Sequence, residues 1–351
     1  MLKRVIFMFL VVASLAACEK EDPITPDTKD FTAVLNNVGN DVIVATYNDL
    51  AQKGAALQSA TQALEADPTP GNLAGARVAW VAARSPWEQS EGFLFGPVDQ
   101  EGLDPSMDSW PVNVIDLNNV LASNNDLTVA FLEQQEGTLK GFHTIEFLLW
   151  GENGDKEVAD FTPREFEYLA AASGALANDT KTLYELWAPS QGNFISNITE
   201  AGNGSIVYIS QKAAVEEITN SLIVIADEVA NGKINDPLSQ EDLTLEESRF
   251  SANSKADFAD NMRSIQNIYL GNFNNSGNSI GLSSVIAEEN PSLDAKVKSE
   301  ITAAIDAIES IPGTFSDAIF NNKNAVIAAQ QAVRNLQETL ESEVLPLVSD
   351  L

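Results

Sequence analysis

The chain has 351 residues, of which 44% are hydrophobic, so it can bury the core of a globular protein of one or two domains. It carries 51 acidic and 20 basic residues, which gives a net charge of −31. This charge repels polyanions, so it disfavours nucleic acid and anionic membrane surfaces as partners and favours cations.

The first 17 residues have the pattern of a secretory signal peptide. Lys3 and Arg4 precede an apolar run, residues 5–15, which is too short for a stable membrane span. The run ends in Leu-Ala-Ala-Cys18, which resembles a bacterial lipobox and implies that Cys18 becomes the lipidated first residue of the mature protein. The alternative is an ordinary signal peptide followed by an accidental cysteine.

Residues 18–30 form a polar tether that contains proline. We therefore expect a cell-envelope protein that is held at the outer membrane by lipid on Cys18, facing either the periplasm or the outside. Because Cys18 is the only cysteine, the chain has neither an internal disulfide nor a thiolate metal cage.

Helical periodicity runs through most of the remaining chain, without the alternation of a convincing strand. Thr162-Pro163-Arg164-Glu165 is an N-terminal capping signal. We expect helices at residues 31–66, 70–93, 162–187 and 206–230, and others that begin at Ser254, Pro291 and Phe315. An Asn- and Gly-rich loop at residues 191–205 places a boundary near residue 200. The chain is therefore predicted to be all-α, with helical domains at residues 31–200 and 201–351.

Residues 85–113 depart from this helical pattern. The segment begins at a helix end with Glu88 and Glu91 and continues through a Gly- and Pro-rich loop to Asp108. Long ordered loops in compact domains are usually functional, and two glutamates three residues apart can project from one helix face. The structural alternative is that Glu88 pairs with Arg84, one helical turn earlier.

Residues 141–151, GFHTIEFLLWG, contain the only histidine. His143 and Glu146 lie one turn apart on a helix that is apolar around most of its circumference, so we expect both side chains to be buried. A buried carboxylate needs a cation, a hydrogen-bond donor or a metal. Gly141 costs roughly 1 kcal/mol inside a helix, which is tolerable where another backbone approaches closely. The alternative to a functional site is a structural His–Glu pair closed by local hydrogen bonds.

Residues 247–271, ESRFSANSKADFADNMRSIQNIYLG, contain a second unusual face. Ser254, with Asp257 three residues later, is expected to cap a helix. Asp257, Asn261 and Ser264 then form a stripe of small polar groups, which we expect to face the other domain and to exchange hydrogen bonds with the His143 helix. The alternative is an ordinary exposed polar face.

Gly141-Phe142-His143-Thr144-Ile145-Glu146 fits the GxHxxE signature of the imelysin-like proteins, the bacterial group that includes the insulin-cleaving membrane protease and iron-regulated proteins. WVAARSPWEQSEGFLFGP, DSWPVN and residues 247–271 resemble stretches of the same family in the same order. The resemblance therefore covers essentially the mature chain. It implies two four-helix-bundle-like domains packed together, with the GxHxxE site near their interface.

The resemblance also implies a ligand set. In related periplasmic iron-uptake proteins, the His and Glu of an HxxE motif and an upstream Glu and Asp are the proposed metal ligands. The matching residues here are His143, Glu146, Glu91 (with Glu88 as the alternate) and Asp108. One imidazole with several carboxylates suits iron, manganese or calcium, and the family makes iron the first choice.

Three functions remain open at this point. The first is a metal-binding lipoprotein linked to iron uptake or handling, with envelope iron-uptake proteins as partners. The second is a peptidase, the class in which the family is catalogued, although HExxH needs two histidines and no nucleophile motif lies near His143. The third is a non-enzymatic surface module that binds haem or a protein.

Overall fold

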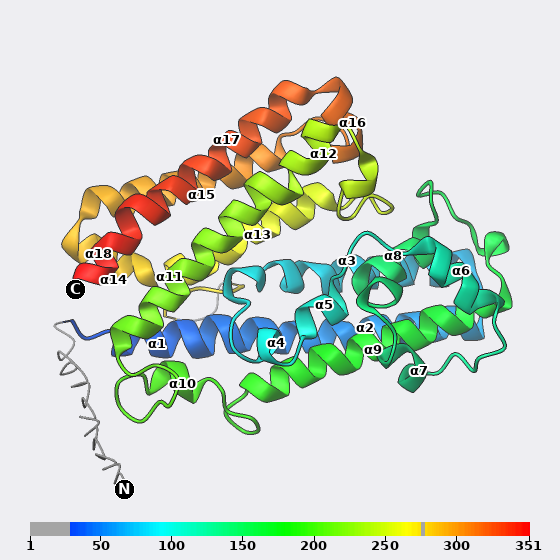
Figure 1. Ribbon diagram of the computed structural model, residues 1–351, viewed down its shortest axis with the longest axis horizontal. Helices are drawn as coiled ribbons and strands as arrows, with labels where there is room; N and C mark the ends of the chain where they lie inside the picture. Colours follow the sequence, from blue (N-terminus) through cyan, green and yellow to red (C-terminus); the bar gives the residue numbers. More distant parts are fainter. Residues whose placement is uncertain (1–28, 275–277) are drawn as a thin grey trace, which may run out of the picture.

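The computed structural model describes residues 29–274 and 278–351. The predicted signal peptide, Cys18 and most of the predicted tether lie outside the described residues. Within them the protein is all-α, as predicted, and contains no strand (Figure 1). Over the same residues, no helix combines the length and the apolar character that a membrane crossing requires.

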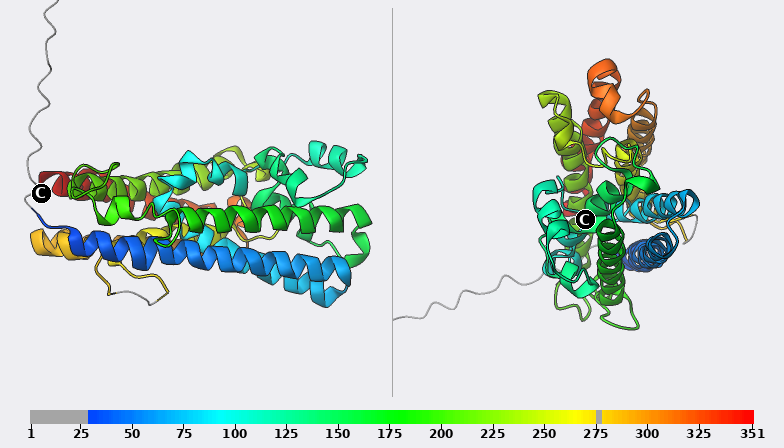
Figure 2. Two further views of the ribbon diagram at one scale, coloured as in Figure 1. Left: turned by 90° about the horizontal axis from the view of Figure 1, so that it is seen from below. Right: turned by 90° about the vertical axis from the view of Figure 1, so that its right-hand side faces the viewer.

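The first half of the chain forms the lower layer of the molecule in Figure 1. α2 packs against α3 and α9, and α8 packs against both α3 and α9. Figure 2 shows α2 (blue) and α9 (green) running side by side along the long axis. The helices of this half are α1 (Thr32–Asn37), α2 (Ala45–Ala66), α3 (Pro70–Glu88), α4 (Pro97–Gln100), α5 (Leu103–Met107), α6 (Val114–Ala122), α7 (Val129–Glu133), α8 (Gly141–Trp150), α9 (Pro163–Trp187) and α10 (Ser196–Thr199).

The second half forms the upper layer in Figure 1. α11, α13, α15 and α17 pack into a bundle, and α13 also packs against α3 of the first half. The helices of this half are α11 (Gln211–Asp227), α12 (Asn235–Gln240), α13 (Ser254–Leu270), α14 (Leu282–Glu289), α15 (Pro291–Glu309), α16 (Phe315–Asn321), α17 (Lys323–Thr339) and α18 (Leu345–Asp350). One apolar core runs through both halves, and the division at residue 200 stays a prediction.

Several helix boundaries agree with those expected from local signals. α1 and α2 form one rod over the predicted range, joined by a π-helical segment, Val38–Val44. α9 begins as predicted, because the side chains of Thr162 and Glu165 cap each other's backbone N–H groups. α3 begins at Pro70 but ends at Glu88, five residues before the predicted end, and a 3₁₀ turn, Glu91–Phe93, follows it.

One predicted helix start and one predicted cap are wrong. The helix expected from Ile206 begins at Gln211, because the Ser210 side chain accepts a hydrogen bond from the Ala213 N–H and caps the helix there. Ser254 does not cap α13 but is its first residue, and its hydroxyl donates to Glu246 Oε1.

Candidate metal centre

Gly141 brings two distant segments of the first half together. It is the first residue of α8, with φ at +73°, and a Cβ atom here would collide with the carbonyl oxygen of Met107. The expected close backbone approach is confirmed, although Gly141 lies at the helix start and not in its interior. Because Asp108 follows Met107, this approach sets the Asp108 carboxylate beside the first turn of α8.

His143 is buried, and its two ring nitrogens face different neighbours. Nδ1 lies 3.2 Å from Glu146 Oε2. Nε2 lies 3.1 Å from Asp108 Oδ1 and 4.0 Å from Glu247 Oε1, yet it has no partner with hydrogen-bonding geometry among the described residues. The other carboxylate oxygen of Glu146 accepts from the backbone N–H of Ser251 at 2.8 Å and from its hydroxyl at 2.7 Å. Glu146 is thus held on one side and orients His143 on the other.

Arg84 lies at the centre of the surrounding charges. Its guanidinium is buried and forms ion pairs with Glu88 and Asp108, and with Glu247 at 2.6 Å, while Asp257 lies 3.6 Å away. The Arg84–Glu88 pair considered as a structural alternative therefore exists, but it is one contact of a larger network.

Lys233 is the second permanent cation of the network and contacts three of its glutamates. Its Nζ lies 2.7 Å from Glu91 Oε2, 3.1 Å from Glu247 Oε1 and 3.5 Å from Glu88 Oε2. The Asn261 amide donates to Glu88 Oε2 at 2.6 Å and to Glu91 Oε2 at 2.9 Å. Glu91 is therefore held by Lys233 and Asn261.

The predicted ligand set is divided between neighbouring groups. Within the part of the chain that the structure describes, ligand atoms close enough to share one ion come from Asp108, His143 and Glu247, and from Glu88, Glu91, Asp108 and Glu247. Asp108 and Glu247 belong to both groups. His143 and Asp108 are brought together as expected, Glu91 and its alternate Glu88 lie in the adjoining group, and Glu146 contacts His143 from outside both groups.

The buried network contains more acidic than basic groups. Arg84 and Lys233 supply two permanent positive charges, and His143 supplies a third when it is protonated. Six carboxyl groups are buried around them: Glu88, Glu91, Asp108, Glu146, Glu247 and Asp257. Unpaired buried charge is costly, so the excess must be neutralised by protons or by a cation.

The pKa values of several carboxyl groups reflect this excess. Burial raises the pKa of Glu88 well above the usual range, although Arg84 and Lys233 oppose it, and burial with repulsion from Glu88 raises the pKa of Glu91 likewise, although Lys233 opposes it. Burial also raises the pKa of Asp257 to about 7. Protons therefore supply part of the neutralisation when no cation is bound.

Asp108 and His143 behave as a coupled pair. Burial tends to raise the pKa of Asp108, but Arg84 and His143 outweigh it and hold that pKa well below its usual range. Burial and Arg84 tend to lower the pKa of His143, but contacts with Asp108 and Glu146 raise it to about 9. At neutral pH the histidine is therefore protonated in the cation-free protein, and Asp108 is charged.

A small cavity gives access to His143. It has a volume of about 210 Å³ and is lined by His143 and Glu247, by Trp110 and the two residues after it, and by side chains between Thr244 and Phe250. The Trp110 and His143 rings lie 6.0 Å apart. An ion with a few water molecules can enter such a space.

The polar stripe on α13 faces the other half, as expected, but its partner is not the His143 helix. Asn261 contacts Glu88 and Glu91, and Asp257 faces Arg84, so the stripe meets α3 and the turn that follows it. The expected pairing with α8 is wrong, because the segment before α13 covers that helix: Ser251 donates to Glu146, and the ring of Phe250 lies 5.1 Å from that of Phe147.

Sequence reasoning missed two members of the network. Glu247 is the first residue of the segment 247–271, which resembles the family, and this resemblance is the one feature of the sequence that could have identified it. Lys233 had no signal of its own, because a single lysine near a helix end is ordinarily a solvated charge. Here it is buried with three glutamates.

Comparisons with known proteins agree with the fold and the motif. The family model Peptidase_M75, described as Imelysin, matches residues 43–342. The chain is 32% identical over 311 residues to "Iron-regulated protein A" of Synechococcus elongatus, covering 88% of this chain and 84% of that protein.

Two solved structures are also similar. A putative iron-regulated protein A precursor from Parabacteroides distasonis superimposes with a TM-score of 0.82 at 28% identity, over 91% of this chain and 95% of that one. An imelysin-like protein from Psychrobacter arcticum gives a TM-score of 0.75 at 15% identity, over 93% and 98%, and this second likeness concerns the fold alone.

Proposed function

The chain belongs to the imelysin family. From this premise we propose that it binds one metal cation between His143, Asp108 and Glu247, and that this cation is iron. Glu146 orients the histidine, and Arg84 and Lys233 balance the remaining carboxylates. In this proposal the protein is a lipid-anchored component of iron uptake or handling in the cell envelope, with other envelope iron-uptake proteins as its partners.

The observation that carries the proposal is the state of His143 Nε2. This atom is buried, lies 3.1 Å from Asp108 Oδ1 and 4.0 Å from Glu247 Oε1 without good hydrogen-bonding geometry to either, and faces a cavity. A metal-binding histidine characteristically donates its other N–H to a carboxylate, and Nδ1 of His143 has Glu146 in that place. The residues present therefore fit a metal ion at Nε2.

The type of donor supports iron. One imidazole and two carboxylates, with space for water, suit iron or manganese. They differ from the thiolate ligands of a cysteine zinc site, and calcium prefers oxygen ligands alone. The relatives from Synechococcus and Parabacteroides are named iron-regulated, which favours iron among these ions. When bound, the cation supplies positive charge to a cluster in which carboxylates outnumber cations.

Glu146 and Glu91 have different roles in this proposal from those implied by the motif. Glu146 uses one oxygen for Ser251 and the other for His143 Nδ1, so it positions a ligand. Glu91 lies 2.7 Å from Lys233 and belongs to the charge balance around that lysine. Glu247 takes the ligand position, because it belongs to the same group as His143 and Asp108.

The other two functions have less support. The cavity of about 210 Å³ is smaller than the roughly 300–1,000 Å³ of pockets that enclose drug-sized ligands, which disfavours haem and a peptide in its present form. The chain contains one histidine, so the two-histidine helix motif of common metallopeptidases cannot form.

Calorimetric titration of Fe²⁺ under anaerobic conditions into chelator-treated protein tests the proposal. We expect one ion per chain for the parent and no measurable binding for His143→Ala. Asp294→Asn is a matched control, because Asp294 is a buried carboxylate in the second half whose partners are Tyr269 and Lys298. Equal heats for the parent and His143→Ala, with both proteins folded by circular dichroism, would exclude this site.

A further inference from the structure

The loop between α10 and α11 exposes three apolar side chains within four residues. Ile206 is 93% exposed, Ile209 66% and Val207 44%. Single exposed apolar residues are ordinary on protein surfaces, whereas a contiguous group marks a surface that contacts a partner or a membrane.

The loop has a defined conformation. The Ser205 hydroxyl oxygen accepts from the backbone N–H groups of Val207 and Tyr208, and the Gly202 N–H donates to the Tyr208 carbonyl. The Tyr208 side chain itself is buried, so it fastens the loop to the core while its neighbours on both sides point outward. The exposure is therefore a property of the folded loop.

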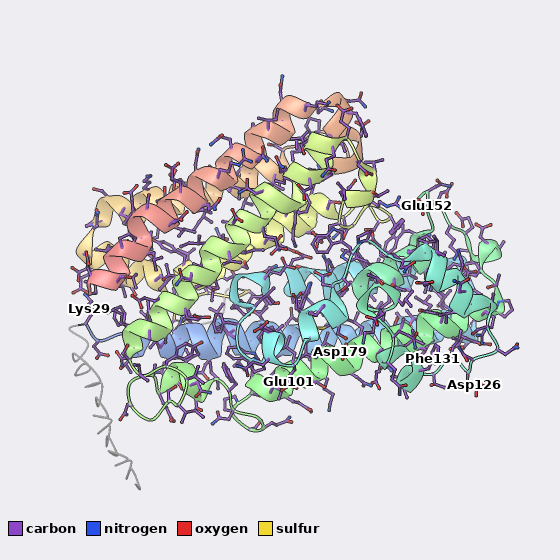
Figure 3. All side chains as sticks on the ribbon, viewed as in Figure 1. Lys29, Glu101, Asp126, Phe131, Glu152 and Asp179 are labelled. Carbon is purple, nitrogen blue, oxygen red and sulfur yellow. The ribbon has the colours of Figure 1, made fainter. Side chains whose placement is uncertain are left out.

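This loop lies beside the start of the described chain. Gln211, two residues after Ile209, accepts from the Phe31 backbone N–H at 2.7 Å and donates to Thr32 Oγ1 at 2.8 Å. In Figure 3, Lys29 lies at the same end of the molecule, where α1 and α11 begin. Eleven peptide units separate Cys18 from Lys29, so this end lies at most about 40 Å from a lipid attached to Cys18.

We propose that Ile206, Val207 and Ile209 insert into the surface of the bilayer that holds the acylated Cys18. The proposal rests on the lipidation of Cys18 and is independent of the metal centre. Residues 201–211 contain no charged side chain, so the contact is apolar and fits a neutral, zwitterionic lipid surface. The lipid anchor keeps the loop at high local concentration near the membrane, which makes a small apolar contact effective.

The consequence is a fixed orientation of the protein on the membrane. The lipid and the loop give two attachments at one end of the molecule, so the start of α11 points toward the bilayer. The far end of the upper layer, where α16 meets the start of α17, points away from it, as does the α6 end of the lower layer (Figure 1).

A labelled cysteine tests the contact. Acylation consumes the Cys18 thiol, so Ile206→Cys in the full acylated chain offers a single site for an environment-sensitive fluorophore. The protein is placed on phosphatidylcholine vesicles, with or without bromine atoms on the acyl chains. Ile327→Cys is the matched control, because Ile327 is 50% exposed near the start of α17.

We expect label at position 206 to emit at shorter wavelength on vesicles and to lose at least half of its intensity to the brominated chains, while label at position 327 changes in neither respect. Equal quenching at the two positions overturns the proposal. A blue shift at position 206 that grows with protein concentration and is insensitive to bromine also overturns it, because a second copy of the chain then covers the loop.

A second measurement uses no label. In the acylated chain, Ile206→Asp combined with Ile209→Asp should lower the fraction bound to dilute phosphatidylcholine vesicles several-fold, with unchanged circular dichroism and unchanged Fe²⁺ titration. Unchanged vesicle binding counts against the contact. If the double variant loses only Fe²⁺ binding, the result concerns the metal centre, and the vesicle binding still decides whether the loop contacts the membrane.

Discussion

His143 Nδ1 lies 3.2 Å from Glu146 Oε2, and this contact turns the other nitrogen of the ring toward Asp108, Glu247 and the cavity. Glu146 is in turn fixed by two donors from Ser251 in the second half of the chain. The orientation of the histidine therefore depends on packing between the two halves.

Glu146→Gln should weaken cation binding by about 10- to 100-fold, the range seen when the carboxylate behind a metal-binding histidine is removed. Both oxygens of Glu146 accept hydrogen bonds, so the amide NH₂ of glutamine would face a donor in either orientation. Calorimetric titration measures the effect, with Asp294→Asn as the control. Parent-like affinity in folded Glu146→Gln would remove Glu146 from the positioning role.

Gly141→Ala should destabilise the protein by about 1–3 kcal/mol, because the positive φ and the Met107 carbonyl both oppose a side chain there. It should also weaken cation binding, since Asp108 must move with Met107. Gly75→Ala is the matched control: Gly75 lies in α3 with open space around it, so the change should stabilise the helix by about 0.5–1 kcal/mol. Urea denaturation compares the two, and equal shifts would contradict the close approach.

The cation-free protein should lose stability as the pH rises from about 4 to 7. Burial raises the pKa of Asp257 to about 7, whereas an unfolded aspartate titrates near 3.9, so the folded chain binds more protons in this interval. The raised pKa of His143, about 9, extends the loss from about 6.5 to 9. Melting temperatures in chelator should therefore fall from pH 5 to pH 8.

Asp257→Asn isolates the contribution of Asp257 to this trend. The asparagine does not titrate, so the fall in melting temperature between pH 5 and pH 7 should become shallower than in the parent. If the parent and Asp257→Asn show parallel profiles, the pKa of Asp257 is not raised in the folded state.

Cation binding should release a proton. In the cation-free protein His143 is protonated below about pH 9, and an imidazolium cannot coordinate a metal. The affinity for Fe²⁺ should therefore increase by up to about tenfold per pH unit between pH 6 and pH 8. Titrations in buffers of different ionisation enthalpy measure the released protons, and heats that do not depend on the buffer would be inconsistent with His143 as a ligand.

Cys18→Ser should move the protein from the membrane fraction to the salt-washed supernatant, because the described residues contain no membrane-crossing helix and attachment is expected through lipid. Cell fractionation with an antibody against the chain tests this. Retention of Cys18→Ser in the washed membranes would show that something other than the lipid holds it.

Local signals in the sequence were sufficient for most helix boundaries, because a cap acts within four residues. The Thr162–Glu165 box and the proline at position 70 are examples. Apolar periodicity extends as far as Ile206 and therefore predicts too early a start for α11, whereas the Ser210 cap sets the start at Gln211. Ile206, Val207 and Ile209, which this periodicity would place in the helix, are the residues proposed to contact lipid.

The contacts of the site were predictable only where the two residues lie close together in the sequence. His143 and Glu146 are three residues apart, so their contact follows from helical geometry. Arg84 contacts Glu247 across 163 residues, and Lys233 meets Glu91 across 142, and such pairs depend on how the two halves pack. The members of a buried charge network come together only in the tertiary structure, so local patterns in one sequence do not identify them.

The most direct test of the metal centre is anomalous diffraction at the iron absorption edge, from crystals of the chelator-treated protein soaked anaerobically in Fe²⁺. The proposal predicts one anomalous peak within about 2.3 Å of His143 Nε2, bounded by Asp108 and Glu247 carboxylate oxygens, with Glu146 still on Nδ1. A peak at another position, or no peak at saturating Fe²⁺, would contradict the proposed centre.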